Sequence, residues 1–387
     1  MGNIISYLKI YGDRTFMDMP LGPVDALILA QFSYFNFDGI VPGVEERKAS
    51  ITMKELSAKA DKKNLFSVDW FKEELEEMFE LLLTTKRFQS LRMNQFVNVI
   101  EHEKETQFSA VTFTLGDGNI FLAFRGTDNE LIGWKEDFNM AYLTPVPSQT
   151  MAVEYADQIA DLYRRKRKAL FYFGGHSKGG NLAVYAAMNC QQKLKERIRI
   201  IFNMDGPGFR PEFFEGMDYA SVKDRISKFV PQSSMIGMLM QPDDHYQVVA
   251  GTVPGTMQHL PLTWQVDGTD FVYVSEVNPK KKKMDDKFNQ WILNMDRKET
   301  ESFLQCMYEL ITSTKATSLK MLTDNWMKQA FVMIGGYKKM DEQTRGMFWE
   351  MTGLFLQMLY VDSTEMIQRM GLLQTFRERI EKAGKIE

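Results

Sequence analysis

A serine stands at the centre of a glycine-rich pattern, Gly175-x-Ser177-x-Gly179, within the stretch FYFGGHSKGGNLAVYAA. The apolar run at residues 169–173 predicts a buried strand before it, and apolar residues at helical spacing follow. A serine on a tight strand-to-helix turn exposes its hydroxyl at the sheet edge, where it can act as a nucleophile. A helix N-terminus favours negative charge, so the backbone N–H of Lys178 is expected to donate to an oxyanion. The alternative, a phosphate-binding turn, would more naturally show G-x-G-x-x-G, which is absent.

A serine hydroxyl needs a base to take its proton, and the chain has four histidines. His176 adjoins the serine within the turn, so its side chain should point away from the hydroxyl. His102 lies on an early strand, before the turn. His259 lies in a loop-like segment after the last clear strand, and we expect it to be the base, with His245 in reserve. The competing interpretation of His259 is a loop histidine that is bonded locally.

The base needs a carboxylate to orient it, and three aspartates are candidates. Asp205 directly follows a predicted strand at residues 198–202 and precedes a Gly-Pro-Gly turn. That position places it on the same sheet edge as Ser177, unless it only begins an Asx turn. Asp243 and Asp244 follow the next strand and are the alternatives. We therefore predict a Ser-His-Asp triad with Asp205 as the acid.

A second oxyanion donor should come from the loop after an earlier strand. Thr127 follows the apolar strand predicted at residues 120–124 and is placed for that role. The sequence contains no CxxC, no HExxH and no other cluster with metal-ligand spacing, so we expect neither a metal nor another cofactor.

Strands and helices alternate along the first part of the chain. This alternation predicts an α/β fold with a mostly parallel sheet, an antiparallel start and flanking helices. Residues 1–20 are expected to form an irregular arm, and the first helix to begin at Pro23. The other predicted strands lie at residues 96–100, 108–115, 226–230 and 246–249, and the other predicted helices near residues 50–60, 70–79, 131–141, 151–162 and 178–187.

The composition changes after Pro279, the last proline of the chain. Methionine becomes frequent there, and apolar residues recur at helical spacing, which predicts several packed helices over residues 284–387. Methionine usually fills irregular cores, and a groove for a binding partner is the alternative. The run at residues 280–283 is expected to be a solvated linker. We therefore predict a domain over residues 1–278 followed by an all-helical region.

Bulk composition excludes several classes of protein. The net charge of −4 gives no field suited to nucleic acid. No stretch of about 18 consecutive apolar residues occurs, so no membrane span is expected. The two cysteines give no disulfide framework, which favours a reducing compartment and a cytoplasmic location.

These motifs together resemble the class 3 lipase branch of the α/β-hydrolases. The segment FRGTD, from Phe124, is similar to that family's oxyanion segment, and GGHSKGGNLA to its serine turn. With NMDGPGF, FVPQSS and QHLPLTW, they look closest to an uncharacterised bacterial family of lipase-like proteins that carries a domain of unknown function. The resemblance covers roughly residues 1–278 and implies a serine hydrolase acting on a carboxylic ester.

The sequence departs from the class 3 lipases at two places. Lys178 replaces the usual apolar residue after the serine and places a cation next to the predicted site. Those lipases carry their triad acid after the strand that here ends at Val230, where this chain has Ser233 and Ser234. The second departure favours a rival interpretation, in which a catalytically silent fold binds a lipid, a peptide or a protein.

Overall fold

The computed structural model describes residues 1–66, 71–128, 130–214, 218–241, 245–314, 341–342, 344–347 and 349. The chain divides into two compact units, one of Met1–Asp128 with Thr144–Val277 and one of Asn129–Leu143 with Asn278–Glu387. The predicted domain limits at residues 278 and 284 stay a prediction.

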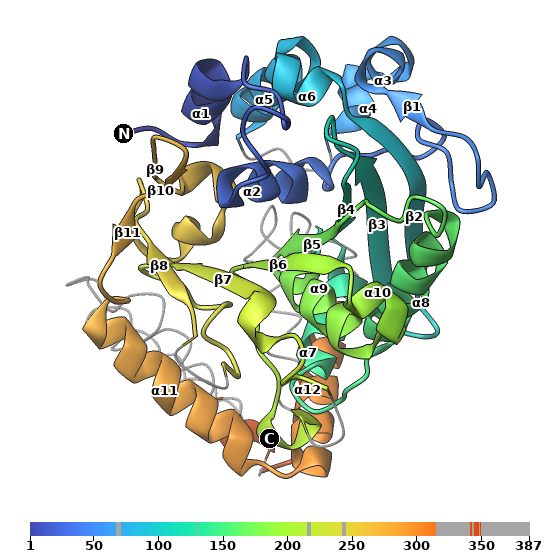
Figure 1. Ribbon diagram of the computed structural model, residues 1–387. Coiled ribbons are helices and arrows are strands. Elements are labelled where there is room, and N and C mark those ends of the chain that lie inside the picture. Colours follow the sequence, from blue (N-terminus) through green and yellow to red (C-terminus); the bar gives the residue numbers. More distant parts are fainter. Residues whose placement is uncertain are drawn as a thin grey trace. The chain divides into compact units, whose positions relative to one another are not determined.

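One mixed sheet organises the first unit (Figure 1). Among the described residues it has nine strands in the order β1-β2-β3-β4-β5-β6-β7-β8-β11. Strands β4 to β8 run parallel, whereas β1 to β4 pair antiparallel and β11 pairs antiparallel with β8. The strands are β1 Ile51–Thr52, β2 Arg92–Glu101, β3 Thr106–Thr114, β4 Ile120–Phe124, β5 Phe171–His176, β6 Ile198–Met204, β7 Ile226–Pro231, β8 Gln247–Val249 and β11 Tyr273–Val274, and β9 Val266–Asp267 pairs with β10 Asp270–Phe271 outside the sheet.

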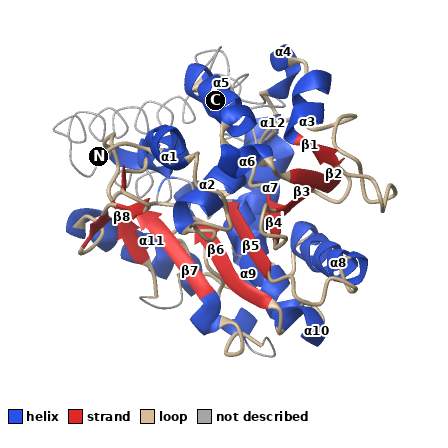
Figure 2. Ribbon diagram, turned by 45° about the horizontal axis from the view of Figure 1, so that its top comes forward, coloured by secondary structure: helices blue, strands red, loops and turns tan. Residues whose placement is uncertain are grey.

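Helices cover both faces of the parallel strands, and the two faces form separate cores (Figures 1 and 2). Phe121 and Ala123 of β4 belong to the core that includes α1 and α2, whereas Leu122 and Phe124 belong to the core that includes α8 and α9. Side chains of a strand alternate between faces, which explains the apolar runs in the sequence. The predicted α/β fold class is confirmed. The helices of this unit are α1 Ile4–Tyr11, α2 Pro23–Phe32, α3 Met53–Lys59, α4 Lys62–Leu65, α5 Lys72–Thr84, α6 Lys86–Gln89, α8 Pro147–Leu162, α9 Lys178–Asn189 and α10 Gln192–Lys195.

The N-terminal arm was expected to be irregular, and that expectation is wrong. Helix α1 occupies this segment because Asn3 caps it, accepting hydrogen bonds from the backbone N–H groups of Ile5 and Ser6. Its apolar face is buried, and Gly2 pairs with Val266 of β9. The short segment thus has both a cap and a buried stripe.

The second unit contains α7 Leu131–Asn139, α11 Pro279–Asn294 and α12 Arg297–Thr312. The Lys135 ammonium of α7 lies 4.4 Å from the centroid of the Tyr308 ring of α12. The predicted linker at residues 280–283 is instead the start of α11, because the Asn278 side chain caps the helix and Pro279 occupies its first turn. Most of the predicted helical region beyond residue 314 lies outside the described residues.

No helix in the described part of the chain is long and apolar enough to cross a membrane.

Candidate active site

Ser177 lies between β5 and α9, at the strand-to-helix turn that the sequence predicts. Its backbone has φ 57° and ψ −132°, a conformation that residues other than glycine rarely adopt. Glycines make this turn possible: a Cβ on Gly179 would stand 2.0 Å from the carbonyl oxygen of Phe124, and one on Gly175 would stand 2.3 Å from the backbone of Gly179. The chain can therefore hold Ser177 in this turn only if small residues flank it.

Asp205 occupies the matching position on the neighbouring strand. His176 of β5 and Met204 of β6 are register partners, so Ser177 and Asp205 both come directly after parallel strand ends. Like Ser177, Asp205 has a positive φ, 54°. Its carboxylate is buried, and its backbone N–H donates to the carbonyl of Phe229, 2.8 Å away. The two predicted functional residues thus share one sheet edge.

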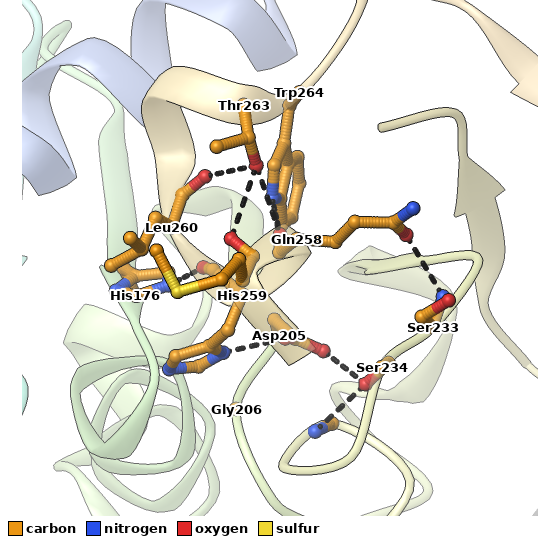
Figure 3. A network of polar contacts seen from close by, with 12 residues as sticks. His176, Asp205, Gly206, Ser233, Ser234, Gln258, His259, Leu260, Thr263 and Trp264 are labelled. Atoms are coloured by element: carbon orange, nitrogen blue, oxygen red, sulfur yellow. Dashed lines mark hydrogen bonds and ion pairs between the residues drawn. The ribbon is translucent and has the colours of Figure 1, made fainter. Parts of the chain in front are cut away.

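His259 contacts the carboxylate of Asp205 (Figure 3). The distance from its Nδ1 to Asp205 Oδ2 is 2.6 Å. If Nδ1–H donates to the carboxylate, Nε2 keeps the lone pair that a base requires. The His259 side chain is 25% exposed, so it can reach a substrate-accessible space. The structure brings the predicted base and acid together, and the predicted approach of His259 to the Ser177 hydroxyl stays a prediction.

Ser234 holds the other oxygen of Asp205, which sequence reasoning missed. Its hydroxyl donates to Asp205 Oδ1 at 2.5 Å and accepts from the N–H of Gly237 at 3.1 Å. Gly237 is required here because a Cβ at that position would stand 2.2 Å from Asp205 Oδ1. The two alternative acids, Asp243 and Asp244, lie outside the described residues.

The loop that carries His259 is fixed on both sides of the histidine (Figure 3). The Gln258 side chain accepts from the N–H of Ser233 at 2.9 Å and donates to the carbonyl of Val253 at 2.8 Å. The indole of the fully buried Trp264 donates to the backbone carbonyl of Gln258 at 2.8 Å. These contacts hold the loop backbone at Gln258, directly before the histidine that contacts Asp205.

His176 cannot readily serve as a base, in agreement with the sequence interpretation, because both ring nitrogens are engaged. Its Nε2 lies 2.7 Å from the backbone carbonyl of His259, and its Nδ1 lies 3.2 Å from the hydroxyl of Tyr34. A neutral ring that donates from Nε2 and accepts at Nδ1 fits both contacts. Burial, assisted by the nearby His259, holds the pKa of His176 well below its usual value of 6.5. The rings of His176 and His259 have centroids 4.4 Å apart, so the residue before Ser177 packs directly on the predicted base.

The two predicted oxyanion donors are sequence neighbours of residues in or next to the serine turn: Lys178 follows Ser177, and Thr127 follows Gly126. Lys178 is the first residue of α9, where backbone N–H groups stand outside the helical hydrogen-bond ladder. The loop after β4 touches the serine turn, because a Cβ on Gly126 would stand 2.6 Å from the carbonyl of His176 and 3.2 Å from Ser177 Cβ. Thr127 follows Gly126 and is half-buried. His245, the reserve base, is exposed.

The family of the chain follows from a comparison with known protein families, in which the Mbeg1-like family matches residues 82–309. The chain belongs to the Mbeg1-like family. This family is lipase class 3-like, so the resemblance to that branch of the α/β-hydrolases is confirmed. Membership of this family indicates that the chain is a lipase-type hydrolase.

Several solved lipase structures are distantly similar to this Mbeg1-like chain. M37 lipase is 16% identical over 56% of this chain and 70% of its own, with a TM-score of 0.37. The Rhizomucor miehei lipase propeptide complex is 15% identical over 43% of this chain and 58% of its own, with a TM-score of 0.31. A fungal lipase–inhibitor complex is 13% identical over 45% and 68%, with a TM-score of 0.33. No curated protein matches significantly.

Metal ligands do not gather at the described residues: no group of three or more His, Cys, Asp or Glu side chains there could hold an ion.

Proposed function

We propose that this Mbeg1-like chain is a serine hydrolase that cleaves carboxylic esters. Ser177 is the nucleophile, His259 the base and Asp205 the acid that orients the base. The observation that carries the proposal is the 2.6 Å contact between His259 Nδ1 and the buried carboxylate of Asp205, one strand away from a serine on a strained turn. Ser177 and Asp205 each follow a strand, and His259 lies in a later loop, which is the arrangement expected of a Ser-His-Asp triad.

The reaction would proceed through an acyl-enzyme. His259 Nε2 takes the proton of the Ser177 hydroxyl as Oγ forms a bond to the ester carbonyl carbon. The negative charge on the carbonyl oxygen is stabilised by N–H donation from Lys178 and a second donor at Thr127. The C–O bond to the leaving alcohol then breaks, and His259 returns the proton to that alcohol. Water, deprotonated by the same histidine, releases the acid and restores Ser177.

Asp205 supports each of these proton transfers. Its buried carboxylate keeps the proton of His259 on Nδ1, so Nε2 faces the reaction as an acceptor, and its charge stabilises the imidazolium that forms. The carboxylate that class 3 lipases place after the strand corresponding to β7 is thereby supplied from the end of β6. This arrangement favours an enzyme over a silent binding fold.

A fluorophosphonate probe tests the proposal, because it forms a covalent bond between phosphorus and an activated serine oxygen with loss of fluoride. The purified wild-type protein should be labelled and should hydrolyse p-nitrophenyl butyrate, and Ser177→Ala should lose both properties. Ser221→Ala is the matched control, since Ser221 is exposed and its hydroxyl donates to the nearby backbone carbonyl of Asp218 at 3.0 Å. A folded wild-type protein that neither reacts nor turns over would instead support a catalytically silent fold.

A further inference from the structure

A lysine that binds an anionic substrate has an accessible ammonium group, whereas the side chain of Lys178 is buried. Its side chain is only 2% exposed, and its ammonium donates to the backbone carbonyl of Gln107, 3.0 Å away on β3. A buried ammonium is costly to desolvate and is retained where it is held by well-placed acceptors. Lys178 therefore connects the start of α9 to β3 beneath the site.

Gln107 continues the connection into the loop after β4. Its side-chain amide donates to Asp128 Oδ1 at 2.5 Å, and its amide oxygen lies 3.4 Å from the N–H of Asp128. Asp128 Oδ2 lies 3.3 Å from the guanidinium of Arg125, which is 5% exposed and also donates to Asn98 at 3.0 Å. Both ends of the four-residue segment Arg125–Asp128 are thus held by partly buried polar contacts.

The contacts join the two parts of the predicted oxyanion hole. At one end of this link is Lys178, whose backbone N–H is the first predicted donor. At the other end is the loop that contains Thr127, the second predicted donor. Between them Gly126 packs against Ser177. The link from Lys178 through Gln107 to Asp128 is therefore one of the contacts that connect the two predicted donors.

We propose that Lys178 is a positioning residue whose ammonium, through Gln107 and Asp128, sets the separation of the two oxyanion donors. This proposal rests on the proposed hydrolase function and assigns the lysine no contact with substrate. An apolar residue at this position would leave the carbonyl of Gln107 without this donor, and the loop would be free to shift. Shifts of about 1 Å at a catalytic group cost up to about 100-fold in rate.

The test compares Lys178→Met with Lys195→Met on a neutral and an anionic p-nitrophenyl ester of equal chain length. Lys195, on α10, is the control because it is also buried and also donates to a backbone carbonyl, that of Met188 at 2.8 Å, in addition to its contact with Asp218 Oδ2 at 2.9 Å. Lys178→Met should lower kcat by about 10- to 100-fold on both esters with little change in KM, because the lost interaction is made only in the transition state. Lys195→Met should keep the wild-type kcat.

A double-mutant cycle with Gln107→Leu sharpens the test. If both side chains act through one link, the combined loss in kcat should be clearly smaller than the product of the two single losses. A selective rise in KM for the anionic ester, an unchanged kcat in Lys178→Met, an equal loss in Lys195→Met or independent losses in the cycle would each overturn the proposal. Absence of turnover and labelling in the wild-type protein would overturn the hydrolase function itself, and this proposal with it.

Discussion

The proposed site has two sides that are built differently. On the nucleophile side, which comprises the serine turn and the loop after β4, close backbone approach decides the geometry, and glycines at 126, 175 and 179 allow it. On the acid side, which comprises Asp205, Ser234 and the loop of His259, side-chain hydrogen bonds decide it. One site thus combines a backbone that tolerates almost no substitution with a side-chain network in which a given group can come from different strands.

The acid side shows such a change. The ends of parallel strands meet at one sheet edge, so a carboxylate can reach the same histidine from β6 or from β7. In this chain β6 provides the carboxylate, and the serine that follows β7 donates to it. The proposed acid therefore follows β6, whereas the resemblance to the class 3 lipases implied an acid after the strand that corresponds to β7.

The largest expected effect on the acid side comes from Asp205→Asn. The amide would favour the wrong tautomer of His259, so kcat should fall by up to about 10⁴-fold. The side chain keeps its size, and the hydroxyl of Ser234 can still donate to an amide oxygen, so the variant should remain folded. Ester hydrolysis and a thermal melt measure the two properties. A loss below about tenfold in a folded variant would assign the acid to another residue, and Asp243 and Asp244 would be the next to substitute.

The two sides also differ in what the sequence could predict. The sequence points to Ser177 and the loop at Thr127 because close backbone approach requires glycine, and glycines in a strand-to-helix context are visible in a sequence. Strands β4, β5 and β6 were predicted to within a few residues because buried parallel strands are continuous apolar runs. Asp205 and His259 were selected from their positions after strands.

The supporting contacts could not be predicted, because they join residues far apart in the chain. Nothing in the local sequence of Ser234 indicates that its hydroxyl meets Asp205, 29 positions earlier. The contact of the Lys178 ammonium could not be predicted either, since a lysine is usually exposed and its partner here is a backbone carbonyl on β3. Helix α1 was missed because its cap and its packing partners determine it more than its short apolar pattern does.

An intermediate effect is expected from Ser234→Ala, which tests whether the network on the acid side behaves as one unit. Removing a hydrogen bond to a buried carboxylate costs about 1.5–3 kcal/mol, because the carboxylate keeps its desolvation and loses a donor. Urea unfolding should show that loss, and kcat should fall by about tenfold as Asp205 becomes freer to turn. Ser233→Ala is the matched neighbour: the Ser233 contact with Gln258 uses its backbone N–H, so both quantities should stay near wild type. Equal effects of the two variants would contradict the role given to Ser234.

The smallest effect concerns the nucleophile side, where His176 is held neutral. Its pKa in the folded protein lies well below 6.5 because of burial and the neighbouring His259, whereas the unfolded chain takes up the proton near pH 6.5. The unfolded state therefore binds more protons as the pH falls below about 6.5, and His176 makes the free energy of unfolding decrease by up to about 1.4 kcal/mol per pH unit. Above that pH the contribution of the neutral ring is fully present.

Urea unfolding between pH 7.5 and 5.5 measures this slope in the wild type, in His176→Gln and in His102→Gln. Glutamine does not titrate, so His176→Gln should be less stable at pH 7.5, through its altered contacts with Tyr34 and the His259 carbonyl, but should lose stability less steeply on acidification. His102 is exposed in the turn between β2 and β3, so its variant should keep the wild-type slope. A slope unchanged in His176→Gln would mean that the folded protein accepts a proton on His176 near pH 6.5, which would contradict a neutral ring bonded at both nitrogens.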